Sequence, residues 1–170
     1  EESHNRKLFE VYADSVALAA PVLPALADYD AVVVTDYGHG MLDAALIEWL
    51  QGAKFLAVNV QTNAGNYGFN LATKWPHCDY LCMDETEARL ATQNQHGPIE
   101  KSAEILMEIS PRVVVTLGSS GAMGMDSRAH HYCSAFQDHV LDTMGAGDAF
   151  FAVTAVLAED TPMPELLRIG

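Results

Sequence analysis

The sequence predicts an α/β fold in which helices cover both faces of a mostly parallel β-sheet. Two observations favour it. Short runs of β-branched and other apolar residues alternate along the chain with segments whose apolar residues recur at helical spacing. The apolar runs carry few polar residues, which is typical of parallel strands buried on both faces. The 170 residues suffice for one domain with a hydrophobic core, and we expect residues 1–170 to form a single α/β domain.

The first half of the chain alternates between the two patterns. In order, we expect a helix at 5–27 with a break near Pro21, a strand at 31–36, a helix at 42–53 closed by Gly52 and a strand at 54–60.

The second half continues the alternation after a polar, glycine-rich connection at 61–70. It is predicted to contain a strand at 79–83, helices at 84–93 and 99–109, a strand at 112–118, antiparallel strands around 122–126 and 130–135, a buried apolar helix at 149–158 and an amphipathic helix after Pro162 and Pro164. Strands that alternate with helices in this rhythm imply a mostly parallel sheet.

Composition excludes several classes of partner. The net charge is −14, from 9 Lys and Arg against 23 Asp and Glu. Such a surface repels phosphate backbones and anionic lipid, so we expect neither nucleic acid nor a membrane as a partner. A small anionic ligand would have to be held locally, by backbone N–H groups and helix ends.

The cysteines indicate a reducing environment. Cys78, Cys82 and Cys133 are odd in number and lack a second pair at a zinc-site spacing. We therefore expect packed, reduced thiols and a cytoplasmic protein.

Ligands of such sheets bind beyond the carboxyl ends of the strands, where loops and helix N-termini meet. The loops predicted to meet there are 36–40, 59–69, 83–87, 116–121 and 142–148. Four of these five begin or end in Asp, Asn or Glu, which favours a polar site.

The last of these loops carries the most informative chemistry. Gly145, Ala146 and Gly147 can turn the backbone so that N–H groups point into one concavity, and the following helix adds its positive end. Asp148 falls in the first turn of that helix. It has two interpretations: a base that accepts the proton of a hydroxyl, or a charge that stabilises the helix.

Asp84 and Glu87 have the spacing of a capping box at the start of a helix. Other signatures are missing. The chain has no G-x-x-x-x-G-K-[ST] loop, no complete dinucleotide fingerprint and no G-x-S-x-G serine motif, so hydride and acyl transfer are disfavoured.

Three segments resemble one family in the right order. The stretch DTMGAGDAFFA at 142–152 is similar to the D-T-x-G-A-G-D signature of the ribokinase-like (PfkB) carbohydrate kinases, and VVVTLGSSGAMGMD at 113–126 is similar to the strand and loop that precede it. The stretch VVVTDYGHGML at 32–42 resembles a segment of heptose kinase members, many of which are fused to a nucleotidyltransferase.

This resemblance implies ATP- and Mg²⁺-dependent transfer of a phosphoryl group to a sugar or sugar-phosphate hydroxyl. Position by position, it implies Asp148 as the catalytic base, with an anion hole at Gly145, Ala146 and Gly147. It further implies nucleotide contacts at Thr116, Gly118 and Gly121, substrate contacts at Asp36 and Asn59, and a metal contact at Glu87.

Some residues depart from the family pattern. Asp84 replaces a common asparagine, His39 a frequent lysine, and Val153 a small residue, while 61–70 lacks the acidic and lysine pattern of heptose kinases. The capping box accounts for Asp84 and Glu87 without a metal, so both interpretations of Glu87 stay open.

The resemblance also implies that the chain is the C-terminal part of a kinase domain, truncated at both ends, and it suggests a fused nucleotidyltransferase and a homodimer. Two alternatives to a sugar kinase remain. One is a non-catalytic nucleotide-binding module, and the other is a nucleoside or vitamin kinase of the same fold.

Overall fold

A computed structural model describes residues 23–127, 129–136 and 145–170. Residues 5–22 of the helix expected at 5–27 lie outside the described ranges, and so do residues 142–144 of the glycine-containing motif. No helix within the described ranges is both long enough and apolar enough to cross a membrane.

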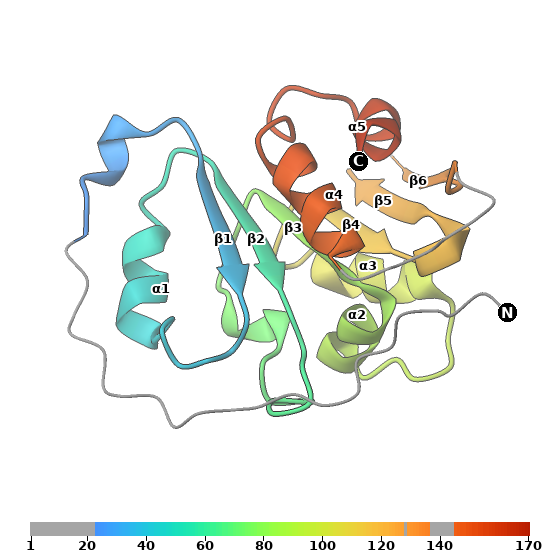
Figure 1. The fold of residues 1–170 in the computed structure, drawn as a ribbon, viewed down its shortest axis with the longest axis horizontal. Coiled ribbons are helices and arrows are strands. Elements are labelled where there is room, and N and C mark those ends of the chain that lie inside the picture. Colours follow the sequence, from blue (N-terminus) through green and yellow to red (C-terminus); the bar gives the residue numbers. More distant parts are fainter. Residues whose placement is uncertain (1–22, 128, 137–144) are drawn as a thin grey trace, which may run out of the picture.

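The predicted α/β architecture is confirmed. In the described part of the chain, six strands form one sheet in the order β1-β2-β3-β4-β5-β6, with β1 and β6 at opposite edges (Figure 1). Strands β1 to β4 run parallel, and β5 and β6 add on antiparallel. Their bounds are β1 Val32–Asp36, β2 Leu56–Val60, β3 Tyr80–Asp84, β4 Arg112–Thr116, β5 Ala122–Asp126 and β6 His130–Cys133.

Within the described ranges, five α-helices connect or follow these strands: α1 Ala44–Leu50, α2 Glu85–Thr92, α3 Ile99–Leu106, α4 Ala146–Ala155 and α5 Met163–Ile169. The same ranges hold three short 3-10 turns: η1 Leu26–Asp28, η2 Ala72–Lys74 and η3 Gly118–Ser120. Helices α1, α2 and α3 share one buried apolar cluster and α4 and α5 share the other, so helices cover both faces of the sheet.

The central strands supply both clusters because successive side chains point to opposite faces. In β3, Leu81 and Met83 belong to the cluster under α1 to α3, whereas Tyr80 and Cys82 belong to the one under α4 and α5. Each apolar run of the sequence therefore supplies side chains to both faces of the sheet in alternation.

Two helices differ from expectation. Helix α1 ends at Leu50, and Gly52 closes it without a positive φ, through a bond from its N–H to the Trp49 carbonyl. Helix α4 is buried on one face only. Phe151 and Ala155 pack on the sheet, but Val153 and Val156 are exposed because the outer side of α4 has no covering layer among the described residues.

The cysteines fulfil the packing prediction. Cys78 and Cys82 are buried free thiols, and Cys133 is half-buried and also free. Burial raises the pKa of both buried thiols to about 12, so they stay protonated in the core.

Candidate active site

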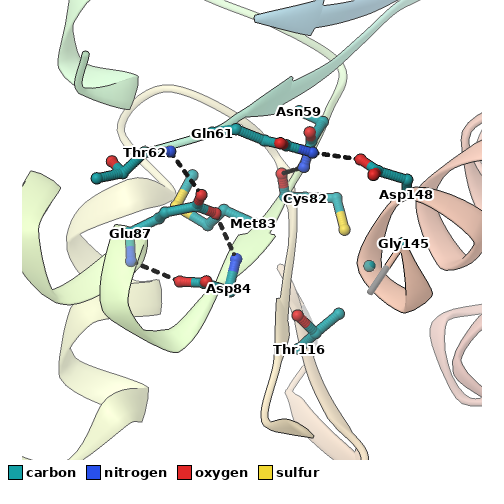
Figure 2. Close-up of a pocket in the computed structure, with 11 residues that line it drawn as sticks. Asn59, Gln61, Thr62, Cys82, Met83, Asp84, Glu87, Thr116, Gly145 and Asp148 are labelled. Carbon is teal, nitrogen blue, oxygen red and sulfur yellow. Dashed lines mark hydrogen bonds between the residues drawn. The ribbon is translucent and has the colours of Figure 1, made fainter. Parts of the chain in front are cut away.

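A polar cavity of about 220 Å³ opens at the carboxyl ends of the parallel strands, facing the N-terminus of α4 (Figure 2). This is the place that the topology predicts for a ligand. The cavity is lined by Asn59, Gln61, Thr62, Cys82, Met83, Asp84, Glu87, Thr116, Gly145, Gly147 and Asp148.

Among the described residues, the lining carries three carboxylates and no Lys, Arg or His. Two of the carboxylates, Asp84 and Glu87, come from the start of α2, and the third, Asp148, comes from α4. A phosphate could enter such a cavity only beside backbone N–H groups or with a cation that offsets this charge.

Asn59 forms the floor on the β2 side. Its Nδ2 donates to the Cys82 carbonyl at 3.0 Å, which ties β2 to β3. Its Oδ1 is buried without a partner among the described residues, and so is the Thr62 hydroxyl oxygen. Buried polar atoms are rarely left unpaired, so both atoms are suited to a ligand that brings its own hydrogen-bonding groups.

The capping box at α2 is confirmed and is built into the cavity wall. The Glu87 N–H donates to Asp84 Oδ1 at 2.7 Å, and the Asp84 N–H donates back to Glu87 Oε2 at 2.8 Å. The second Glu87 oxygen accepts the Thr62 N–H at 2.7 Å, so Glu87 joins α2 to the loop after β2 (Figure 2).

Glu87 is only 8% exposed, and its ionisation is perturbed. Burial raises the pKa of Glu87 from 4.5 to about 7, and the charges of Asp84 and Asp148 act in the same direction, while the N–H groups of Asp84 and Thr62 oppose the rise. Near neutral pH this carboxyl group is therefore divided between its two protonation states.

The donor set fits a hydrated Mg²⁺. The part of the chain that the structure describes holds no group of three metal-ligating side chains. Mg²⁺, however, keeps several waters and binds through one or two carboxylates together with substrate phosphates. Asp84 and Glu87 line the cavity and offer such oxygens, and a divalent cation would also offset the acidic lining.

The turn before α4 faces these residues. Gly145 is left-handed, with a φ of 75°, and it caps the helix without a side-chain bond. The first N–H groups of a helix have no acceptor within the helix, so this turn offers free donors at its positive end. Of the predicted anion-hole residues, Gly145 and Gly147 line the cavity and Ala146 lies between them.

Asp148 is exposed in the first turn of α4. Its Oδ1 accepts a hydrogen bond from the Gln61 side-chain amide and lies 3.5 Å from the Tyr37 hydroxyl. Burial and then the Asp148 charge raise the pKa of Tyr37, which keeps this phenol protonated as a donor.

Asp36 does not reach the cavity. It is 1% exposed, and its carboxylate accepts from Lys74 Nζ at 2.6 Å and Trp75 Nε1 at 3.1 Å. The Gly38 N–H also donates to it at 3.2 Å. The contacts of this carboxylate are therefore structural: they join the end of β1 to the segment at Lys74 and Trp75.

Of the residues predicted to contact the nucleotide, only some line the cavity. Thr116 lines the cavity, whereas Gly118 and Gly121 belong to the turn beyond β4 and are not among the lining residues. Gly121 has a φ of 96°, and a Cβ there would lie 2.0 Å from the Cys133 carbonyl oxygen, so the close approach of β6 requires a glycine.

The structure therefore brings together Asn59, Glu87, Thr116, Gly145, Gly147 and Asp148. It adds Gln61 and Thr62, which were not singled out individually from the sequence. Their signal was present: both directly follow β2 and fall within the loop expected at the site edge.

The chain is similar to known carbohydrate kinases. Residues 16–170 match the model of the pfkB family of carbohydrate kinases. The chain is 32% identical over 82 residues to a deoxyribokinase of Salmonella typhimurium, an alignment that covers 46% of this chain and 27% of that protein. It is 32% identical over 93 residues to a ribokinase of Lactococcus lactis, which covers 54% and 29%.

Solved structures share the fold. Phosphofructokinase-2 from Escherichia coli in complex with potassium superposes with a TM-score of 0.68 at 22% identity, over 81% of this chain and 47% of that one. Ribokinase from Thermotoga maritima gives a TM-score of 0.65 at 22% identity, over 85% and 48%. The chain thus spans about half the length of these structures, and its alignments cover less than a third of the two curated relatives.

Proposed function

Because the chain belongs to the pfkB family of carbohydrate kinases, we propose that the full-length protein transfers the γ-phosphoryl group of ATP to a hydroxyl of a sugar or sugar phosphate. One observation carries the proposal: Asp148 and the first turn of α4 face Asn59, Thr116 and Glu87 across a single cavity. A proton acceptor and N–H donors thus lie together.

Asp148 is the proposed base. It accepts the proton of the acceptor hydroxyl as that oxygen forms its bond to the γ-phosphorus, while the bond from the phosphorus to the bridging oxygen of ADP breaks. Asp148 lines the cavity and is exposed, so an incoming hydroxyl can reach its carboxylate.

The N–H groups of the turn at Gly145, Ala146 and Gly147 form the proposed anion hole. They are held by the backbone of α4 and need no rearrangement as negative charge grows on the transferring oxygens. Mg²⁺, when bound, would neutralise part of the phosphate charge, and Glu87 and Asp84 are the residues proposed to hold it through water.

The acceptor side is assigned to Asn59. Its buried Oδ1, which has no partner among the described residues, can accept a hydrogen bond from a hydroxyl, which suits a polyhydroxylated substrate. Thr116 is the proposed nucleotide contact on the cavity wall, with Gly118 and Gly121 shaping the turn that follows it. Asp36 is proposed to support the acceptor side from below.

The acceptor class is open to direct measurement. Relatives are described as a ribokinase and a deoxyribokinase, whereas the 32–42 segment resembles heptose kinases. An ADP-release assay of the full-length protein with ATP and Mg²⁺ should therefore compare pentoses, hexoses, heptoses and their phosphates, with nucleosides and vitamin alcohols as the contrasting set.

Turnover with at least one sugar or sugar phosphate is the expected result. Nucleotide binding without transfer to any acceptor would favour a non-catalytic module instead, and turnover confined to nucleosides or vitamins would reassign the substrate. A cytoplasmic location, a homodimer and a fused nucleotidyltransferase are further proposals. Light scattering and sequencing of the complete reading frame test the last two.

A further inference from the structure

The Asp148 carboxylate is held from outside its own helix. Its two side-chain hydrogen bonds among the described residues come from the segments that follow β2 and β1, from the Gln61 amide and the Tyr37 hydroxyl. Both involve Oδ1, so neither contact occupies Oδ2. Figure 2 shows Gln61 reaching from the end of β2 to the start of α4.

Gln61 is well placed to act as a fixed support because its backbone is bonded on both sides. Its N–H donates to the Asp36 carbonyl at 2.9 Å, and its own carbonyl accepts from Asn70 Nδ2 at 3.0 Å. Only its side chain is free to extend into the cavity.

The support beneath Gln61 is buried and charged. Asn70 is 5% exposed, and its Nδ2 donates to the Asp36 backbone oxygen at 2.9 Å. The Asn70 Oδ1 accepts from Lys74 Nζ at 2.7 Å, and Lys74 pairs with the Asp36 carboxylate at 2.6 Å. Polar networks that are satisfied in this way are rigid.

We propose that Gln61 is the positioning residue of the base: its amide N–H fixes Asp148 Oδ1 and turns Oδ2 toward the acceptor hydroxyl. The inference rests on the proposed role of Asp148. A neutral amide suits this task because its N–H can hold a carboxylate oxygen through a hydrogen bond without adding a positive charge that would weaken Asp148 as a base.

Two substitutions in the full-length protein separate positioning from simple structural support. Gln61→Met keeps the length of the side chain and removes the donor. We expect kcat to fall about 10- to 100-fold, because the base loses a charge-assisted hydrogen bond that fixes its orientation. In the pH profile of kcat, the acid limb should move to higher pH. The KM for ATP should change less than about threefold.

Gln61→Lys keeps a donor and adds a positive charge beside the carboxylate. Its acid limb should move to lower pH, opposite to that of Gln61→Met. General disruption of the fold cannot produce opposite shifts. Gln51→Met serves as the matched control. The Gln51 amide donates to the Ile47 carbonyl at 3.4 Å at the C-terminal end of α1, and Gln51 does not line the cavity, so wild-type kinetics are expected for this variant.

Circular dichroism and thermal unfolding establish that each variant is folded before kinetics are compared. Wild-type kcat and an unshifted acid limb in folded Gln61→Met, alongside an inactive Asp148→Asn, would overturn the role of Gln61 and leave the proposed base intact. Normal turnover by Asp148→Asn would instead remove the base itself and the role of Gln61 with it.

Discussion

The perturbed carboxyl group of Glu87 leads to a pH dependence of stability that can be isolated with one substitution. Glu87→Gln removes the ionisable group and keeps the size of the side chain. The amide oxygen can still accept one of the two backbone N–H groups that Glu87 now accepts, from Asp84 and Thr62. The loss of the other bond lowers stability by an amount that is independent of pH.

The magnitude follows from the shift. Burial raises the pKa of Glu87 from 4.5 to about 7 in the folded protein, so the native state binds the proton more tightly than the unfolded chain. Stability that depends on Glu87 is therefore fully present below the unfolded pKa and is lost as the pH rises through the folded pKa. Between pH 5.5 and pH 8 the loss amounts to about 2 kcal/mol.

The assay is urea unfolding of wild type and Glu87→Gln at several pH values across this interval, without nucleotide or metal. The free energy of unfolding of the variant should rise relative to wild type by about 2 kcal/mol from the acid to the alkaline end. Glu104→Gln is the matched control, because Glu104 lies exposed on α3 in a pair with Lys101.

A difference between Glu87→Gln and wild type that stays constant from pH 5.5 to pH 8 would refute the reasoning. Such a result would mean that the two backbone donors offset the effect of burial. The cavity would then hold a fully ionised Glu87 at neutral pH, which would strengthen its case as a metal contact.

Two further predictions concern the supports of the site. Gly121→Ala should lower the free energy of unfolding by about 2 kcal/mol or more, because its Cβ would lie 2.0 Å from a backbone oxygen at the end of β6. Gly68→Ala, at a φ of 77° with open space around it, should cost about 1 kcal/mol in the same urea titration, and equal losses would contradict the steric argument. Lys74→Met should cost about 2–4 kcal/mol by leaving buried Asp36 without its cation. Lys54→Met, which breaks an exposed pair with Asp30, should leave the melting temperature nearly unchanged. Unchanged stability of Lys74→Met would argue against the role of the buried Lys74–Asp36 pair.

The local parts of the fold could be predicted from the sequence. Short apolar runs identify the parallel strands, since a strand buried on both faces has little room for polar residues. The capping box of Asp84 and Glu87 is equally local, because its two bonds join residues three positions apart.

The meeting of the loops at the carboxyl ends of the strands could be predicted, but the individual side-chain contacts between distant segments could not. The Gln61 amide and Asp148 are 87 positions apart, and no periodicity relates them. Asp36 is a similar case, since its burial depends on Trp75, which lies 39 positions later. The family resemblance implies a substrate contact at Asp36, which stays a prediction, while its buried bonds to Lys74 and Trp75 come from the fold.

The central claim is that Asp148 is the base of a phosphoryl transfer. Its most direct test is the kcat of Asp148→Asn in the full-length protein, measured with ATP, Mg²⁺ and the best acceptor, alongside calorimetric binding of ADP. The account predicts a fall in kcat of about 10²- to 10⁴-fold with ADP affinity changed less than about threefold. Near wild-type kcat in a variant that binds ADP normally would contradict it.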